Sequence, residues 1–269
     1  MMNNLETSMS FEGKVALVTG GSSGLGRATA LRLATVGCAV GVLGQNREKV
    51  TEVVSEVRQA GGRAHPLVAD VASERDMEAA VASLVQEFGR LDYLFANAGI
   101  NGVWAPIDEI TPEEWDRTIA TNLRGTYLTL HYGVPHLKTA GGGAVVITAS
   151  VNGTRIFSNA GATAYSATKA AQVAMTQMLA LELAKFRIRV NVVCPGAIET
   201  AIDESTTKRH QEVAGEPVEY PEGEIPLTRG QPGTADEVAE LVTFLLSERA
   251  RHITGTPVWI DGAESLLVG

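Results

Sequence analysis

The chain has 269 residues, 45% of them hydrophobic, with a formal net charge of −9. It can therefore form one large core, and its acidic excess argues against binding to nucleic acid or an anionic membrane. The two cysteines, Cys38 and Cys194, lie in apolar runs, a pattern typical of a reducing compartment and not of a disulfide framework. Residues 1–10 lack the features of a signal peptide, and no apolar run reaches the ~18 residues of a membrane span. We expect a cytoplasmic protein with a flexible amino-terminal segment over residues 1–10.

Short apolar runs alternate with runs of helical periodicity along the chain. The runs typical of buried parallel strands are 14–19, 39–43, 63–68, 91–96, 143–148, 188–193 and 257–260. The helical segments are 24–36, 47–60, 73–88, a long helix opened by a Thr111 capping box, 164–186 and 234–248. Strands and helices in this order predict the α/β class: a Rossmann-type, doubly wound, seven-stranded parallel sheet flanked by helices, in a single domain of residues 11–269.

Residues 201–229 interrupt this alternation with a long stretch rich in proline and glutamate. A loop of this length is usually a lid or a binding segment, so we expect a substrate lid here. Its glutamates form either a solvated face or a surface that repels anionic substrates, which weighs against an acyl-carrier-linked ketoreductase. These residues are Glu212, Glu216, Glu219, Glu222 and Glu224. The five histidines show no zinc-binding spacing, so no metal site is expected.

A glycine-rich run joins the first predicted strand to the first predicted helix. Glycine at such a junction permits a tight turn and a close approach of the backbone to a pyrophosphate. The strand before it and the helix after it favour dinucleotide binding over a plain turn. The residues expected to contact the cofactor here are Gly20, Ser22, Ser23, Gly24, Leu25 and Gly26.

Tyr165 and Lys169 are four residues apart in a predicted helix, so they share one helix face. A phenol with a pKa near ~10 is a poor acid or base at neutral pH. A neighbouring cation favours the ionised phenol, so we expect Lys169 to lower the pKa of Tyr165. The plain alternative is an exposed pair on a helix surface.

These motifs occur together with Asn97-Ala-Gly99 and Pro195-Gly196. In this order they resemble the short-chain dehydrogenase/reductase family, and the resemblance covers roughly residues 11–264. It implies that Ser150 hydrogen-bonds the substrate oxygen and that Tyr165 is the catalytic acid/base. It also implies that Lys169 lowers the tyrosine pKa and binds the nicotinamide ribose, and that Asn122 holds a water in the proton relay.

The resemblance assigns further cofactor contacts along the carboxyl ends of the strands. Asp70 and Val71 match the pair beside the adenine ring. The motif residues Asn97, Ala98 and Gly99 are either structural or face the cofactor. The residues expected around the nicotinamide are Pro195, Gly196, Ile198 and Thr200.

The choice between NAD and NADP depends on the end of the second predicted strand. An NAD site normally has an acidic residue there, which holds the ribose 2′-hydroxyl. This chain has Gly44, followed by Gln45, and Arg47 lies close enough in sequence to pair with a 2′-phosphate. NADP is therefore favoured, with NAD as the alternative. Arg47 could equally be a solvated residue at the start of a helix.

The run from Ser150 to Tyr165 departs from the family pattern. The two residues are fifteen positions apart, about two more than the family resemblance implies, and the extra length falls in 154–161. We expect either a reshaped substrate wall, with Ile156 and Phe157 in contact with substrate, or a harmless surface insertion. Trp104 and Tyr220 are further candidate substrate contacts.

Together these features predict an NAD(P)-dependent oxidoreductase that interconverts a secondary alcohol and a ketone on a neutral small molecule. The alternatives are a non-catalytic dinucleotide-binding sensor, or a family member that catalyses epimerisation or dehydration. Residues 254–262, followed by 266–268, resemble the family segment used in subunit packing. We expect a homotetramer, with a dimer as the alternative.

Overall fold

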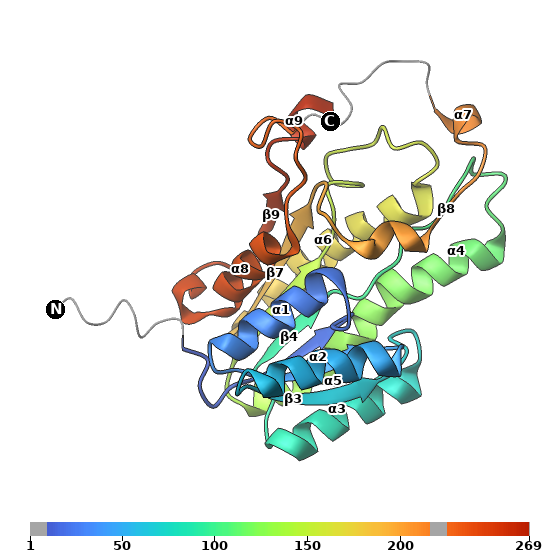
Figure 1. Cartoon of the computed structure of the whole chain (residues 1–269). Helices are drawn as coiled ribbons and strands as arrows, with labels where there is room; N and C mark the ends of the chain where they lie inside the picture. Colours follow the sequence, from blue (N-terminus) through green and yellow to red (C-terminus); the bar gives the residue numbers. More distant parts are fainter. Residues whose placement is uncertain (1–9, 216–224, 269) are drawn as a thin grey trace.

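Seven parallel strands form the central sheet of the computed structural model, which describes residues 10–215 and 225–268 (Figure 1). Their order across the sheet is β3-β2-β1-β4-β6-β7-β9. Their bounds are β1 Val15–Thr19, β2 Ala39–Gly44, β3 Arg63–Val68, β4 Tyr93–Ala96, β6 Gly143–Thr148, β7 Ile188–Pro195 and β9 Pro257–Ile260. The strand order reverses between β1 and β4, which is where open α/β sheets bind ligands. The predicted Rossmann-type sheet is confirmed.

Helices cover both faces of this sheet. One face is covered by α1 (Gly24–Thr35), α2 (Arg47–Gln59) and α8 (Ala235–Leu246). The other is covered by α3 (Glu74–Phe88), α5 (Gly125–Thr139) and α6 (Thr163–Ala184). Each predicted boundary of these elements lies within two residues of the observed one.

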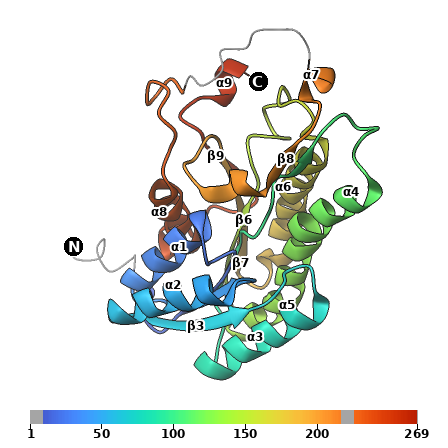
Figure 2. The same cartoon turned by 45° about the vertical axis from the view of Figure 1, so that its right-hand side comes forward.

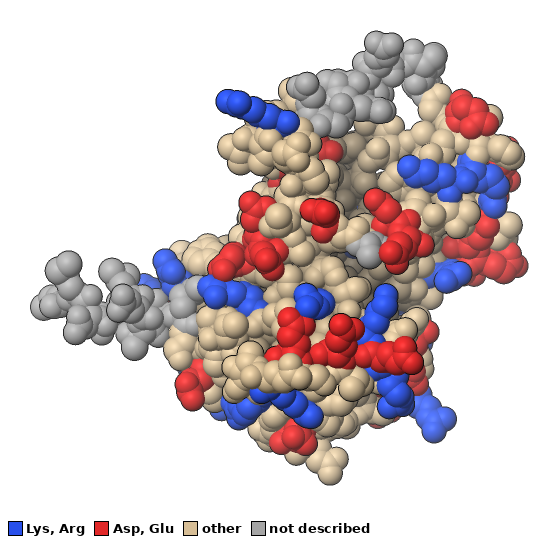
Figure 3. All heavy atoms as spheres, in the orientation of Figure 1, with Lys and Arg blue, Asp and Glu red and all other residues tan. Residues whose placement is uncertain are grey.

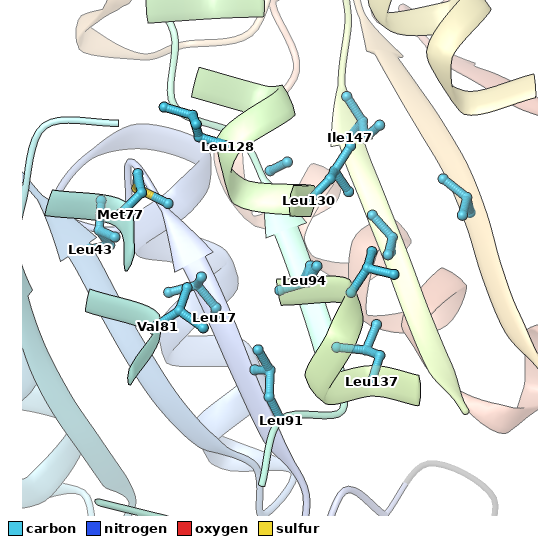
Figure 4. Close-up of a cluster of buried hydrophobic side chains, with 14 of the residues drawn as sticks. Leu17, Leu43, Met77, Val81, Leu91, Leu94, Leu128, Leu130, Leu137 and Ile147 are labelled. Atoms are coloured by element: carbon cyan, nitrogen blue, oxygen red, sulfur yellow. The ribbon is translucent and has the colours of Figure 1, made fainter. Parts of the chain in front are cut away.

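The strands supply the core by pointing alternate side chains to opposite faces. In β1, Leu17 packs toward α3 and α5, whereas Val18 packs toward α1 and α8. Figure 4 shows the first of these clusters, with Leu17 close to Val81 of α3 and Leu94 close to Leu137 of α5. The sheet is thus buried on both faces, and its strand ends are held rigidly in place.

The predicted long helix is divided in two by a π-helical turn. Thr111 and Glu114 form the expected capping box at the start of α4 (Pro112–Ile119). The turn Ala120–Arg124 follows and leads directly into α5. Such π turns frequently occur at functional sites, and this one contains Asn122.

Two short strands were not predicted. β5 (Gly102–Trp104) pairs in parallel with β8 (Thr206–Lys208) in a separate two-stranded sheet. In Figure 2 this pair lies near the upper end of the molecule, together with α7 (Gln211–Ala214) and α9 (Ser265–Val268). Residues 1–9 of the expected flexible segment 1–10 lie outside the described residues, as do residues 216–224 of the expected lid, which include the candidate substrate contact Tyr220. Within the ranges that are described, no helix is long and apolar enough to span a membrane.

Candidate active site

A cavity of about 280 Å³ opens beside the carboxyl ends of β1, β4, β6 and β7. The predicted site residues that line it are Gly20, Ser23, Gly24, Leu25, Asn97, Ala98, Gly99, Ser150, Tyr165, Lys169, Pro195, Gly196, Ile198 and Thr200. Lining residues that the sequence analysis missed are Thr148, Ala149, Ile202 and Ser205. The first two directly precede Ser150, so their place at the end of a strand was the available signal. The other two lie in the expected lid.

The glycine turn has the geometry of an anion cradle. Gly20 and Gly24 adopt left-handed backbone conformations, with φ of +65° and +47°, which side chains rarely tolerate. Ser23 is the N-cap of α1, yet its side chain makes no capping hydrogen bond. At Gly24 a Cβ would lie 3.5 Å from the Thr200 side chain. The cradle therefore fits a dinucleotide pyrophosphate at the amino end of α1.

Asn97 uses its amide to tie three strands together. Its Nδ2 donates to the Thr19 carbonyl at 3.2 Å, and its Oδ1 accepts from Thr148 Oγ1 at 3.1 Å. Its backbone N–H donates to Thr19 Oγ1 at 3.0 Å. Asn97 thus joins β1, β4 and β6 next to the cavity. The sequence left open whether Asn97 is structural or faces the cofactor, and these hydrogen bonds are structural.

Tyr165 and Ser150 are both buried, with 6% of each residue exposed. Burial raises the pKa of the Tyr165 phenol to about 12, while a hydrogen bond with Ser150 acts in the opposite direction. Ser150 Oγ accepts from the backbone N–H of Asn152 at 3.1 Å. That bond leaves the serine proton free to be donated within the cavity.

Lys169 lies beside Tyr165 but does not contact its hydroxyl. Its Nζ donates to the Thr148 carbonyl at 2.8 Å and lies 5.4 Å from the centre of the Tyr165 ring. Burial lowers the pKa of Lys169 to about 8. Lys169 is not among the groups that shift the Tyr165 pKa in this structure, so its expected role in lowering that pKa stays a prediction.

Asn122 is fully hydrogen-bonded and does not line the cavity. Its Oδ1 accepts from Ile100 N at 2.8 Å, and its Nδ2 donates to the Ile100 carbonyl and to Thr168 Oγ1. Its own carbonyl accepts from Thr126 Oγ1 at 2.7 Å and from Gln172 Nε2 at 2.9 Å. Both lone pairs of that carbonyl thus have protein donors. Gln172, which no sequence motif indicated, supplies one of them.

The residues expected at the adenosine end lie outside the cavity. Gln45 and Arg47 are exposed at the start of α2, whereas Gly44 is buried. Asp70 Oδ1 accepts from Ala72 N at 2.9 Å. Val71 is buried. Ser22 and Gly26 do not line the cavity, and Gly26 serves to let α1 pack closely on the backbone of Gly20.

Trp104, one of the predicted substrate contacts that the structure describes, does not line the cavity but packs near Tyr165. The centre of its ring is 6.3 Å from that of Tyr165, and its Nε1 donates to the Asn101 carbonyl. Ile156 is buried within its own loop, and Phe157 is 75% exposed. Neither residue lines the cavity, so their predicted contact with substrate has no geometric support here.

The described residues of the segment 201–229 make several contacts with the rest of the domain, and two of these involve long polar side chains of Arg209 and Gln211. Arg209 donates to both carboxylate oxygens of Glu114, at 2.9 and 3.1 Å, which joins the end of β8 to α4. Gln211 Nε2 donates to the Ala160 carbonyl at 2.8 Å.

On the face shown in Figure 3, acidic and basic side chains are interspersed. No cluster of three potential metal-ligating side chains occurs among the residues outside 1–9, 216–224 and 269.

Comparison with known proteins identifies the family. A family model described as short chain dehydrogenase matches residues 14–211, so the chain belongs to the short-chain dehydrogenase/reductase family of oxidoreductases. Cyclohexanol dehydrogenase of Acinetobacter sp. (strain SE19) is 39% identical over 255 residues, covering 94% of this chain and 95% of that protein. Levodione reductase of Leifsonia aquatica is 38% identical over 258 residues, covering 95% of each.

Solved structures agree with the fold. A 3-ketoacyl-ACP reductase from Sinorhizobium meliloti 1021 is 62% identical with a TM-score of 0.90, covering 94% of this chain and 99% of that chain. A 3-ketoacyl-(acyl-carrier-protein) reductase from Brucella melitensis, complexed with NADH, is 33% identical with a TM-score of 0.83, covering 95% and 100%. A short chain dehydrogenase from Burkholderia cenocepacia J2315, in complex with NADP, is 35% identical with a TM-score of 0.81, covering 94% and 98%.

Proposed function

We propose that the chain is an NAD(P)-dependent oxidoreductase that interconverts a secondary alcohol and a ketone on a neutral small molecule. The observation that carries this proposal is that the buried side chains of Ser150 and Tyr165 line the same cavity as Lys169. Solved relatives with NADH and with NADP support nicotinamide dinucleotide binding. The glycine cradle would hold the pyrophosphate, and the bound cofactor would supply or accept the hydride.

Tyr165 is the proton donor in ketone reduction. With a pKa near 12, its phenol is fully protonated at neutral pH and can donate to the substrate oxygen as that oxygen gains negative charge. The Ser150 hydroxyl donates a second hydrogen bond to the same oxygen. In alcohol oxidation the proton moves the other way, so Tyr165 must first be deprotonated, and that direction is favoured by alkaline pH.

The substrate class we propose is a cyclic ketone or alcohol. Two relatives, at 39% and 38% identity, are named for cyclohexanol and levodione. The face of Trp104, 6.3 Å from Tyr165, offers an apolar surface against which an alicyclic ring can pack. We further propose that residues 201–229 act as the lid over this ring.

A second candidate is the reduction of a 3-ketoacyl thioester, because the Sinorhizobium meliloti 3-ketoacyl-ACP reductase is 62% identical to this chain. The net charge of −9 disfavours docking of an acidic carrier protein. A homotetramer in the cytoplasm, with a dimer as the alternative, stays a prediction of the sequence. Light scattering on the eluted protein distinguishes the two assemblies.

Purified protein should oxidise NADPH or NADH with cyclohexanone-type ketones faster than with a 3-ketoacyl thioester. Tyr165→Phe should lower kcat at least about 100-fold, because it removes the proton donor. Tyr127→Phe is a matched control, since Tyr127 is a 50% exposed tyrosine on α5 that does not line the cavity. Full activity of Tyr165→Phe would overturn the assignment. Cofactor binding without net turnover of any carbonyl substrate would favour a sensor, or an epimerase or dehydratase.

A further inference from the structure

We propose that Thr154 is a positioning residue for Ser150 and that the indole N–H of Trp259 holds Thr154 in place. This inference rests on the proposed function, in which Ser150 hydrogen-bonds the substrate oxygen. It gives a role to a residue of the lengthened run between Ser150 and Tyr165, since Thr154 lies in the stretch 154–161 where the extra length was placed. That run was expected to be either a substrate wall or a harmless insertion.

The Thr154 hydroxyl connects the end of β6 to the last strand of the sheet. Its Oγ1 lies 2.6 Å from the Ser150 carbonyl and 3.0 Å from the Val151 carbonyl, to which it donates. The same oxygen accepts from Trp259 Nε1 at 3.2 Å. The Thr154 hydroxyl therefore donates its proton to backbone carbonyls and accepts a hydrogen bond from the indole at the same time. These bonds fix the orientation of the hydroxyl.

Trp259 is itself held from two sides. It lies in β9, where it pairs with Cys194 of β7. The guanidinium of Arg155 lies over the face of the Trp259 indole. Its Cζ is 3.7 Å from the centre of the ring, close enough for a cation–π contact. The backbone of β9 and the Arg155 guanidinium thus hold the indole in place. In this position its N–H donates to Thr154.

The turn after Ser150 transmits this restraint to the serine side chain. Backbone N–H groups of Thr154, Arg155 and Ile156 all donate to the Val151 carbonyl, at 3.1, 2.9 and 2.9 Å. Val151 N in turn donates to Pro195 O at 2.9 Å. The Asn152 N–H that orients Ser150 Oγ belongs to the same turn. Loss of the Thr154 hydroxyl would remove the side-chain donor to the Ser150 carbonyl and leave the Val151 N–H bond to Pro195 O as the remaining restraint described for that peptide group. We expect the Ser150 side chain to shift with this less restrained peptide group.

The consequence should appear in catalysis and not in cofactor binding, because Thr154 does not line the cavity. Thr154→Val keeps the shape of the side chain and removes the hydroxyl, whereas Thr154→Ser keeps the hydroxyl. Trp259→Phe keeps an aromatic ring and removes the N–H. Small displacements of a catalytic group lower the rate strongly.

The test compares kcat, the KM for nicotinamide cofactor and the melting temperature of these variants, with cyclohexanone as the substrate. We expect Thr154→Val and Trp259→Phe to lower kcat about tenfold while the cofactor KM stays within about twofold of wild type. Thr154→Ser should retain most of the activity. The double variant should be no slower than Thr154→Val alone, because both changes break one connection.

A Ser150→Ala background separates positioning from other effects. If Thr154 acts through Ser150, Thr154→Val should leave the residual rate of Ser150→Ala unchanged. If Thr154→Val instead lowers the rate of Ser150→Ala by the same factor as it lowers the wild-type rate, the inference is overturned. It is also overturned if Thr154→Val alone has a wild-type kcat and only a lowered melting temperature. Failure of the proposed function would look different, because wild-type protein would then show no turnover and no dependence on Tyr165.

Discussion

Gly44 lies directly against Ser22: a Cβ on residue 44 would come within 2.6 Å of Ser22 Oγ and 3.1 Å of Val50 Cγ2. A side chain at residue 44 would therefore require the Ser22 hydroxyl to move away. The lack of an acidic residue at the end of β2 thus has a steric aspect in addition to its effect on the charge near the cofactor.

Introducing an acidic residue at position 44 alone should fail. Gly44→Asp should raise the KM for NADH and for NADPH together, because the new side chain displaces Ser22 and with it the glycine turn. Adding Ser22→Gly removes the nearest obstacle, so the double variant should recover NADH use while NADPH use stays low. Steady-state kinetics with both cofactors check this. Efficient NADH use by Gly44→Asp alone would contradict the steric explanation.

Arg47 is the cation available to a 2′-phosphate, and it is exposed at the first position of α2. Arg47→Gln should raise the KM for NADPH about fivefold and leave the KM for NADH unchanged, because the loss of one partly screened charge pair costs about 1 kcal/mol. Arg249→Gln changes an exposed arginine that lies after α8, away from α2, and so controls for the change in net charge. An equal effect of Arg47→Gln on both cofactors would show that Arg47 does not read the phosphate.

The buried ammonium of Lys169 makes stability depend on pH. Its pKa falls from 10.5 to about 8 on burial, so between these values the unfolded chain binds more protons than the folded one, and stability rises with pH. Relative to Lys169→Met, the wild-type protein should gain up to about 1.4 kcal/mol per pH unit in this window. Denaturant unfolding at pH 8, 9 and 10 measures the difference. A constant difference would mean that Lys169 is not desolvated.

The ion pair between Arg209 and Glu114 should matter for substrate more than for stability. Its side chains are 31% and 27% exposed, and because solvent screens such an ion pair, breaking it should change stability little. Glu114→Gln preserves an oxygen for the capping box at Thr111 and removes the charge. We expect a severalfold rise in the KM for ketone with an almost unchanged melting temperature. Arg209→Met should behave alike, and the double variant should be no worse than either single change.

The sheet could be predicted because its strands are continuous apolar runs buried on both faces, as in Val15–Thr19. The capping box at Thr111 marked the start of α4 for an equally local reason. β5 and β8 could not be predicted. Each has three residues, and they pair Gly102 with Thr206 across a long stretch of chain, so no periodicity records them.

The grouping of the candidate catalytic residues in one cavity could likewise be predicted from spacing, but their electrostatics could not. Tyr165 and Lys169 line one cavity as expected. The direction of the tyrosine pKa depends on burial and on where the ammonium points, and neither is encoded in a four-residue interval. Gln172 was missed because its partners, Asn122 and Thr126, lie on another helix.

Asn97 has a consequence for how experiments on this family member are interpreted. A scan of alanine variants scored by activity in crude extract would count Asn97 among the cofactor ligands. The Asn97 side-chain amide is hydrogen-bonded to β1 and β6. Removal of this amide would leave the Thr19 carbonyl and the Thr148 hydroxyl without this partner. We therefore expect Asn97→Ala to lower the fraction of folded molecules, although Asn97 also lines the cavity. Active-site titration is therefore needed before the residue is given a chemical role.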